Sequence, residues 1–190
     1  MPAFTQLDHL DSTAPGNLFR TLKSAMLDLL PSTTPTVESR DFWQLFAATE
    51  LRRLPTGYAI FKQGDTGDSA YIVASGRLGG TVTFRKRDEV KTFTLGVGDM
   101  VGEISLLAGV PRTATVETLS PTHLLEIPRE ALSVFLSRRP DFAEVLANLV
   151  AERQNSDREY LDGLAAVDDE AMARSRNRES VLSYLLGFVR

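Results

Sequence analysis

The segment 101–116, VGEISLLAGVPRTATV, places a glycine, a carboxylate and an arginine close together in the chain. Gly102 lets the backbone come close to a ligand, because no side chain blocks the approach. The short helical turn predicted after it would present free N–H groups at its start, which attract anions. Arg112 supplies a guanidinium group suited to a phosphate oxygen, and Glu103 supplies a carboxylate that accepts hydrogen bonds, as from ribose hydroxyls. Together these residues predict a cradle for a sugar phosphate.

The same segment resembles the phosphate-binding cassette of cyclic nucleotide-binding domains, whose pattern is roughly F-G-E-[IL]-[AS]-L…P-R-[AT]-A-[TS]-V. This chain has VGEISL at 101–106 and PRTATV at 111–116, and it departs from the pattern only at Val101, where the family has an aromatic residue. Turn motifs upstream also resemble that family, in the order FKQGD (61–65), GDSAYIV (67–73) and SG (75–76). The resemblance covers about residues 41–154.

The resemblance implies a role for each residue of the cassette. Glu103 would accept a hydrogen bond from the ribose 2′-hydroxyl, and Arg112 would pair with the exocyclic phosphate. The hydroxyl of Thr113 and the backbone of Ala114 would add hydrogen bonds. Backbone contacts near the sugar phosphate would come from Gly102, Ile104 and Ser105. Taken alone, Arg112 would be a surface arginine on a strand and Glu103 a carboxylate stabilised by the helix dipole; within the cassette we expect both to contact the ligand.

The base of the nucleotide is less well specified than the sugar phosphate. Phe93 would form a wall of the base pocket, or else belong to the core as a phenylalanine in a strand usually does. Arg153, on a predicted long helix, would reach the base as part of a lid, or else be a solvated helix charge. The Thr113 hydroxyl could reach the amino group of a guanine in the syn conformation, yet related domains with Thr here also respond to the adenine nucleotide. We therefore expect cAMP and leave cGMP open.

Composition narrows the classes of function. The 190-residue chain is 43% apolar and 24% charged, as in ordinary globular proteins, and its net charge of −4 argues against non-specific nucleic-acid binding. Without cysteine it has no disulfide, thiolate nucleophile or cysteine metal site, which suits a cytoplasmic protein. No apolar run approaches the length of a membrane-spanning helix.

His9 and His123 lie far apart in sequence, and we expect His123 to be packed or at the surface rather than a ligand. We find no nucleophile–base pair, metal cluster or Walker-type loop, and so predict neither an enzyme, a cofactor nor a metal site.

Short β-type runs separated by turn residues extend from Leu51 to Pro128 and predict an antiparallel sandwich or barrel. The predicted strands are Leu51–Leu54, Tyr58–Phe61, Ala70–Ala74, Leu78–Lys86, Val90–Leu95, Met100–Val101, Thr113–Leu119 and His123–Ile127. Gly79-Gly80 inside one run indicates a bulge, a close backbone approach or an irregularity of an edge strand. With the resemblance, the fold class is α+β: an antiparallel β-roll, a jelly-roll-like double-stranded β-barrel, flanked by N- and C-terminal helices.

Apolar periodicity predicts helices on both sides of the roll. They are Leu18–Leu30 with Asn17 as its cap, about Glu38–Glu50, Arg129–Arg139, Asp141 to about Leu161, and about Asp168–Phe188. We predict three parts: a leader, helix and linker at 1–37, a cyclic nucleotide-binding domain with lid helices at 38–164, and a helical extension at 165–190.

The helical extension bears on what the domain controls. Bacterial transcription factors of the resembled family carry a helix-turn-helix after the long helix, and the segment after Leu164 is too short and too acidic for one. The end of the chain, with VLSYLLGF at 181–188, loosely resembles tails of bacterial mechanosensitive-type channels with cytoplasmic nucleotide-binding domains. We expect a regulatory module that signals through movement of its C-terminal helices, with a protein partner or self-association through them. The alternative is a ligand-free β-roll that serves as a scaffold or protein-interaction domain.

Overall fold

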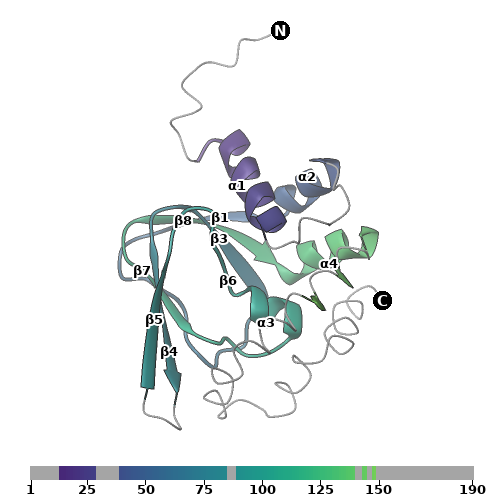
Figure 1. Cartoon of the computed structure of the whole chain (residues 1–190). Coiled ribbons are helices and arrows are strands. Elements are labelled where there is room, and N and C mark those ends of the chain that lie inside the picture. Colours follow the sequence, from purple (N-terminus) through teal and green to yellow (C-terminus); the bar gives the residue numbers. More distant parts are fainter. Residues whose placement is uncertain (1–12, 29–38, 85–88, 140–142, 145–146, 149–190) are drawn as a thin grey trace.

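The structure is a computed structural model that describes residues 13–28, 39–84, 89–139, 143–144 and 147–148. In these ranges the strands are Glu50–Leu54 (β1), Ala59–Phe61 (β2), Ser69–Ser75 (β3), Leu78–Phe84 (β4), Glu89–Leu95 (β5), Met100–Val101 (β6), Thr115–Thr118 (β7) and Thr122–Pro128 (β8). They form two four-stranded sheets, with the orders β1-β8-β3-β6 and β2-β7-β4-β5 (Figure 1). All of their pairings are antiparallel. The antiparallel β-roll is therefore confirmed, as two facing sheets rather than a closed barrel.

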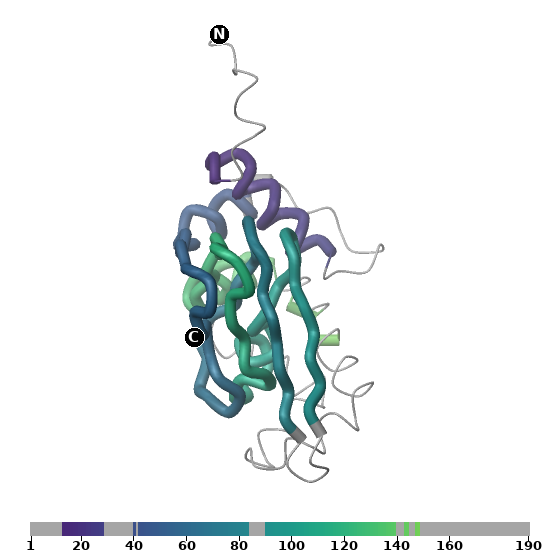
Figure 2. Tube along the Cα trace, turned by 90° about the vertical axis from the view of Figure 1, so that its left-hand side faces the viewer, coloured from purple at the N-terminus to yellow at the C-terminus, as the bar shows by residue number. Residues whose placement is uncertain are grey.

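The helices of the described part are Pro15–Asp28 (α1), Ser39–Ala47 (α2), Glu103–Ala108 (α3) and Arg129–Arg138 (α4). Figure 1 shows α1, α2 and α4 on the side of the first sheet that faces away from the second sheet. The view turned by 90° in Figure 2 shows β4 and β5 running side by side along the roll. The α+β class with helices around the roll is thus confirmed, while the C-terminal helices predicted after residue 148 lie outside the described residues.

Strand β3 belongs to two hydrophobic clusters, one on each face of the first sheet. Side chains alternate between the faces of a strand, so neighbouring residues point in opposite directions. Ile72 packs with the helices, and Val73 packs between the two sheets, both with no exposed surface. The helix cluster also takes in Leu22 of α1 and Phe42 of α2. Helix α1, which we assigned to the segment 1–37, therefore packs on the roll, while the domain boundaries themselves stay predictions.

Two helix boundaries differ from the prediction by three residues, and α4 ends at Arg138 rather than at Arg139. Helix α1 begins at Pro15 rather than at Leu18, because a proline suits the first turn, where its missing N–H is not needed. Helix α2 ends at Ala47 rather than at Glu50, and Glu50 begins strand β1. Helix α1 also stacks against α2, where the rings of Phe19 and Trp43 lie nearly parallel with 3.9 Å between their centres.

Gly79 and Gly80 lie in the middle of a regular strand. Strand β4 pairs with β5 and β7 on its two sides, and Gly80 stands opposite Phe93 without a register shift. The bulge and the edge-strand irregularity that we considered are therefore both wrong. A Cβ added at Gly80 would overlap the ring of Phe93, so the close approach is that of an aromatic side chain to the backbone.

Candidate functional site

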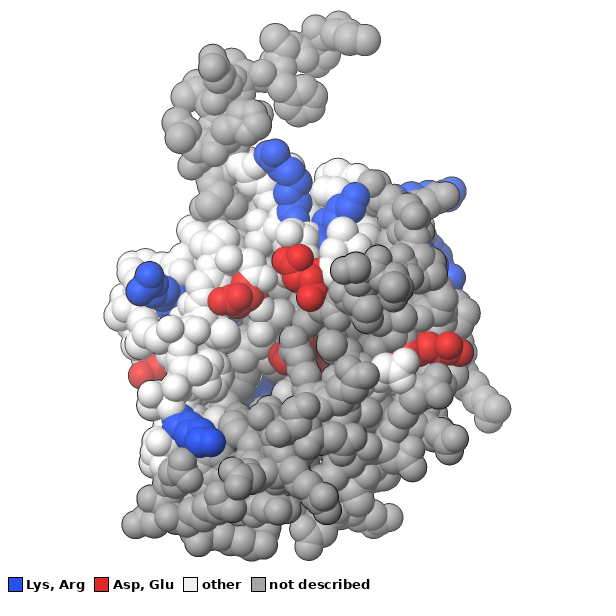
Figure 3. Space-filling view, viewed as in Figure 1, with Lys and Arg blue, Asp and Glu red and all other residues white. Residues whose placement is uncertain are grey.

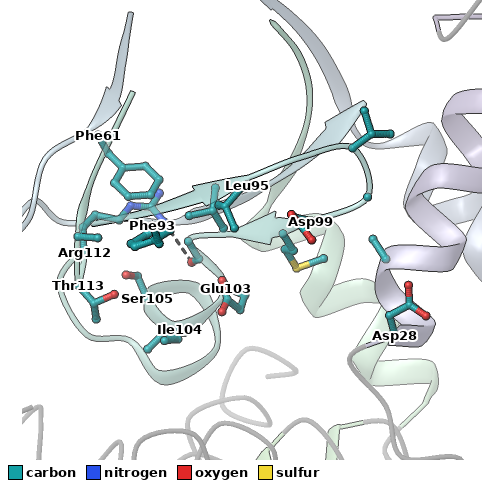
Figure 4. Close-up of a pocket in the computed structure, with 17 residues that line it drawn as sticks. Asp28, Phe61, Phe93, Leu95, Asp99, Glu103, Ile104, Ser105, Arg112 and Thr113 are labelled. Atoms are coloured by element: carbon teal, nitrogen blue, oxygen red, sulfur yellow. Dashed lines mark hydrogen bonds between the residues drawn. The ribbon is translucent and has the colours of Figure 1, made fainter. Parts of the chain in front are cut away.

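A cavity of about 500 Å³ opens between the second sheet, strand β6, helix α3 and the C-terminal end of α1 (Figure 4). That volume suits a ligand of nucleotide size, since small-molecule sites span about 300–1,000 Å³. All seven residues of the predicted cassette site line it, namely Gly102, Glu103, Ile104, Ser105, Arg112, Thr113 and Ala114. Phe93, predicted as a base-pocket wall, lines it too, and it also packs against the cluster between the sheets. The cavity therefore brings the cassette and the aromatic residue together.

Helix α3 is set in place by a backbone turn at Gly102. This residue has φ 82° and ψ 1°, a left-handed conformation that L side chains rarely adopt. Glu103 begins the helix, and the Leu106 N–H donates to the Gly102 carbonyl at 3.1 Å. The hydroxyl of Ser105, which is 1% exposed, donates to the Pro111 carbonyl at 3.2 Å. This bond ties α3 to the loop that carries Arg112.

The backbone of Arg112 is fixed by the loop after strand β2. Its N–H donates to the Asp65 carbonyl at 2.8 Å, and its carbonyl accepts from the Gly64 N–H at 2.8 Å. Arg112 stands in the connection between α3 and β7 and is 3% exposed. The reading of this residue as a surface arginine on a strand is therefore wrong.

The side chain of Arg112 donates three hydrogen bonds to the protein. Its Nη1 donates to the Ser69 carbonyl at 2.7 Å and to the Gly102 carbonyl at 3.1 Å, and its Nη2 lies 3.4 Å from the Ser69 Oγ. The Cζ atom lies 4.3 Å from the ring centre of Phe61 and 5.9 Å from that of Tyr71. Aromatic faces attract a guanidinium at such distances, so the cation is held by rings as well as by carbonyls.

One donor of this buried cation has no partner. The Nε of Arg112 is buried and makes no hydrogen bond within the described part of the chain. Burial lowers the pKa of Arg112, while the neighbouring Tyr71, Asp68, Glu126 and Asp65 raise it. An arginine does not lose its proton inside a protein, so the charge persists. A buried donor left unpaired is costly, and an anionic oxygen would satisfy it.

Gly67 and Gly102 leave the room that the guanidinium of Arg112 occupies. A Cβ at Gly67 would overlap the Nε and Cζ of Arg112, and one at Gly102 would overlap its Nη1. From the sequence we identified the motif around Gly67 only as a turn motif. The proximity of Gly67, Phe61, Ser69 and Tyr71 to Arg112 was not predicted, although all four stand in the upstream motifs at 61–65 and 67–73.

Other lining residues of the cavity were missed as well. They are Ala25 and Asp28 of α1, Phe61, Leu95, and the run Val97 to Val101. Nothing local in the sequence connects α1 with the cassette, because the two segments meet only through packing on the first sheet. Figure 4 shows Asp28 and Asp99 toward one end of the cavity and Arg112 at the other. The cavity thus has a cationic end and an acidic end.

Two residues considered from the sequence, Arg153 and His123, are not among the described residues that line the cavity. Arg153 falls outside the described residues. His123 makes a hydrogen bond through its Nδ1 with the Ser75 Oγ at 2.8 Å and does not line the cavity, as expected.

The described residues contain no group of three or more His, Asp or Glu side chains placed to hold a metal ion. They also contain no helix long and apolar enough to cross a membrane. On the face seen in Figure 3, acidic and basic side chains are interspersed.

Known proteins share this combination of fold and motifs. Residues 51–139 match the cyclic nucleotide-binding domain family. The cyclic AMP receptor protein of Thermus thermophilus is 38% identical over 104 residues, which cover 55% of this chain and 48% of that protein. Among solved structures, the Thermus thermophilus catabolite activator protein superposes with a TM-score of 0.57 at 26% identity, covering 86% of this chain and 85% of that one. The regulatory domain of Toxoplasma gondii PKA with cAMP gives 0.56 at 25% identity, covering 66% and 45%.

The fold and the site together define a β-roll with a cavity of nucleotide size beside a buried arginine. Residues 51–139 belong to the cyclic nucleotide-binding domain family. By their names, the relatives above are a receptor, an activator and a regulatory domain. The matched region covers 44–48% of the cyclic AMP-related bacterial regulators, and only 8–9% of the patatin-like phospholipase domain-containing proteins that the chain also matches.

Proposed function

We propose that this chain is a non-enzymatic regulatory module that binds a cyclic nucleotide, preferably cAMP, in the cassette cavity. The observation that carries the proposal is the buried guanidinium of Arg112 with its unpaired Nε at one end of that cavity. A cyclic phosphodiester carries a single negative charge, so one arginine together with backbone N–H groups is enough to balance it. A scaffold without a ligand would gain nothing from a buried donor that lacks a partner.

The proposed contacts are those that the family resemblance implies for each residue of the cassette. Arg112 binds the exocyclic phosphate, and the Thr113 hydroxyl and Ala114 backbone add hydrogen bonds. Glu103, in the first turn of α3, accepts from the ribose 2′-hydroxyl. The backbones of Gly102, Ile104 and Ser105 contact the sugar phosphate. All of these residues line the same cavity, which supports the assignment.

The base lies against Phe93, whose ring is held over the backbone of Gly80. The preference for cAMP is supported by the relatives, since the Thermus thermophilus relative is a cyclic AMP receptor and the Toxoplasma gondii structure contains cAMP. The competing ligand is cGMP, because the Thr113 hydroxyl could bond to the amino group of its guanine base. If Arg153 belongs to a lid over the base, it would add to this contact.

The output of the module is a shift between two conformations that bind the ligand differently. Helix α4, which leads to the predicted lid helices, packs on α2 through the rings of Phe135 and Phe42, 5.7 Å apart. We propose that C-terminal helix movement passes the signal to a protein partner or to a second copy of the chain. The cytoplasmic location, the absence of a nucleic-acid role and the similarity to channel tails stay predictions.

Calorimetric titration of the purified protein with cAMP and then cGMP tests the proposal. Mass spectrometry of the denatured sample first excludes a nucleotide that was bound during purification. We expect binding at micromolar concentration or tighter, with cAMP preferred. Arg112→Ala should lose about ten- to a hundredfold in affinity, the cost of a charge-assisted hydrogen bond. Arg53→Ala is the matched control, because Arg53 is an exposed arginine of β1 outside the cavity.

The alternative is a β-roll that survives as a scaffold or protein-interaction domain. It predicts no heat with either nucleotide for a protein whose circular dichroism shows it folded. It also predicts that Arg112→Ala leaves partner binding unchanged. That combination of results would overturn the sensor proposal.

A further inference from the structure

A chain of hydrogen bonds leads from Arg112 to the surface of the first sheet. The Nη2 of Arg112 lies 3.4 Å from the Ser69 Oγ, and the Ser69 Oγ lies 3.0 Å from the Tyr71 hydroxyl. The Tyr71 hydroxyl in turn lies 3.1 Å from the Oε1 of Glu126. At the far end, the Oε2 of Glu126 lies 3.6 Å from the Nη1 of Arg52, whose side chain is half exposed. The chain thus connects the cavity to solvent.

The strands set this alignment. Ser69 and Tyr71 are two positions apart on β3, so both point to the face between the sheets. Glu126 of β8 stands directly opposite Tyr71 in the register of the two strands. Directly opposed residues in antiparallel strands have neighbouring side chains. The contact between Tyr71 and Glu126 is therefore a product of strand register.

The chemistry of the two ends fixes the direction of every bond between them. A guanidinium only donates, and an ionised carboxylate only accepts. Arg112 therefore donates to Ser69, Ser69 donates to Tyr71, and Tyr71 donates to Glu126. Each hydroxyl accepts one bond and donates one, so neither is free to rotate. Hydrogen bonds linked in this way strengthen one another.

The three bonds to Ser69 and Gly102 use a defined part of the guanidinium. Its five N–H groups include two on Nη1, and both are given to carbonyls. One N–H of Nη2 goes to the Ser69 hydroxyl. The Nε–H and the second Nη2–H remain, and they lie along one edge of the planar group. Two parallel donors of this kind match two oxygens of a phosphate.

We propose that Tyr71 and Glu126 are positioning residues that hold Arg112 with its Nε–Nη2 edge available to the anion. This rests on the proposed function for the identity of the ligand, while the fixed pose of Arg112 is a property of the protein alone. Burial raises the pKa of Tyr71, which keeps its hydroxyl protonated and able to donate. The ring of Tyr71 also faces the cation, so its hydroxyl and its ring act on the same group.

The variants remove the chain while leaving the packing in place. Tyr71→Phe deletes the hydroxyl and keeps the ring. Glu126→Gln keeps the shape but removes the charge and adds an amide donor, so the bond between Tyr71 and position 126 no longer has a fixed direction. Glu50→Gln is the matched control, because the Oε2 of Glu50 lies 3.7 Å from the same Arg52 but is outside the chain. Trp43 fluorescence and circular dichroism check that each variant folds.

The first readout is the Nε–Hε resonance of Arg112 in ¹⁵N NMR of the ligand-free protein, assigned with Arg112→Lys. We expect a sharp signal that exchanges slowly with water in the parent and in Glu50→Gln. In Tyr71→Phe and Glu126→Gln it should broaden and exchange about tenfold or more faster, as the buried pose loosens. A signal unchanged in both variants would overturn the proposal. Since no ligand is added, this readout holds even for a protein that binds no cyclic nucleotide.

The second readout is cAMP affinity in a double-mutant cycle. Tyr71→Phe should weaken binding about three- to tenfold, the range of one neutral hydrogen bond. In the Arg112→Lys background the same change should have no further effect, because the residue it positions has been replaced. An equal loss in both backgrounds would show that Tyr71 acts on the fold in general and would also overturn the proposal.

Discussion

The guanidinium of Arg112 lies in the space that a side chain at Gly67 would fill. Gly67 has no left-handed backbone angle, so it is required here for room and not for conformation. The loop that contains it is held from the other side by Arg129, whose backbone N–H donates to the Asp68 carbonyl at 2.8 Å. The backbone of Gly67 is therefore held close to the guanidinium of Arg112.

Gly67→Ala should displace Arg112 and weaken cAMP binding about tenfold or more, because the anion then loses a charge-assisted partner. Calorimetric titration measures the affinity, and urea unfolding measures the stability. Gly16→Ala is the control, since a Cβ at that exposed position of α1 meets no other atom. Unchanged affinity in Gly67→Ala would show that the ligand does not depend on this pose of Arg112.

Glu103→Gln should weaken binding of cAMP about tenfold, because a hydrogen bond to a carboxylate is replaced by a weaker one. The matched ligand is 2′-deoxy-cAMP, which lacks the hydroxyl that Glu103 is proposed to bind. We expect the variant and the parent to bind 2′-deoxy-cAMP equally. Glu117→Gln, at an exposed position of β7 outside the cavity, should bind both ligands as the parent does. A similar loss for both ligands would contradict the ribose contact.

Phe93→Leu should weaken cAMP binding about fivefold or more, since stacking of a base on an aromatic ring is worth about 1–3 kcal/mol. Leucine keeps an apolar side chain against the cluster between the sheets, so most of the stability should remain. Val90→Ala tests a neighbouring, exposed position of the same strand. If Phe93→Leu loses stability but not affinity, then Phe93 belongs to the core alone.

The stability of the parent should fall more steeply than that of Tyr71→Phe in alkaline solution. Burial, together with the charge of Glu126 and its hydrogen bond, raises the pKa of Tyr71 above 10.0, although Ser69 and Arg112 act in the opposite direction. The folded state then holds this proton to higher pH than the unfolded chain does. The contribution of Tyr71 to the free energy of unfolding is fully present below the pKa that it has in the unfolded chain. This contribution is lost as the pH rises through the pKa that it has in the folded state.

Urea unfolding at about pH 8 and about pH 11, followed by the fluorescence of Trp43, measures this difference. Trp43 is suited to the purpose because the chain has a single tryptophan. Phenylalanine at position 71 has no proton to lose, so subtracting its pH profile isolates Tyr71 from the other groups. Parallel profiles for the two proteins would mean that Tyr71 ionises alike in the folded and unfolded states.

The cassette was predictable from the sequence because its members are local in the chain. Gly102, Glu103 and Arg112 fall within one short segment, so residue type and spacing alone indicate a sugar-phosphate site. The strands were predictable for a similar reason, since alternating apolar residues and turn residues act over a few positions. The start of β7 was placed too early, because Thr113 and Ala114 belong to the loop that lines the cavity.

The tertiary structure alone decided how Arg112 is held. Its partner Ser69 stands 43 positions earlier in the chain, and Tyr71 meets Glu126 across 55 positions through the register of β3 and β8. It also brought α1 to the wall of the cavity and the ring of Phe93 onto Gly80. Local propensity contains no information on such contacts, because they arise when strands far apart in sequence pair and their faces pack. The sequence thus determined which chemical groups the site contains. The packing of the roll determined that its arginine is buried, is held by neighbouring groups and has an Nε without a partner.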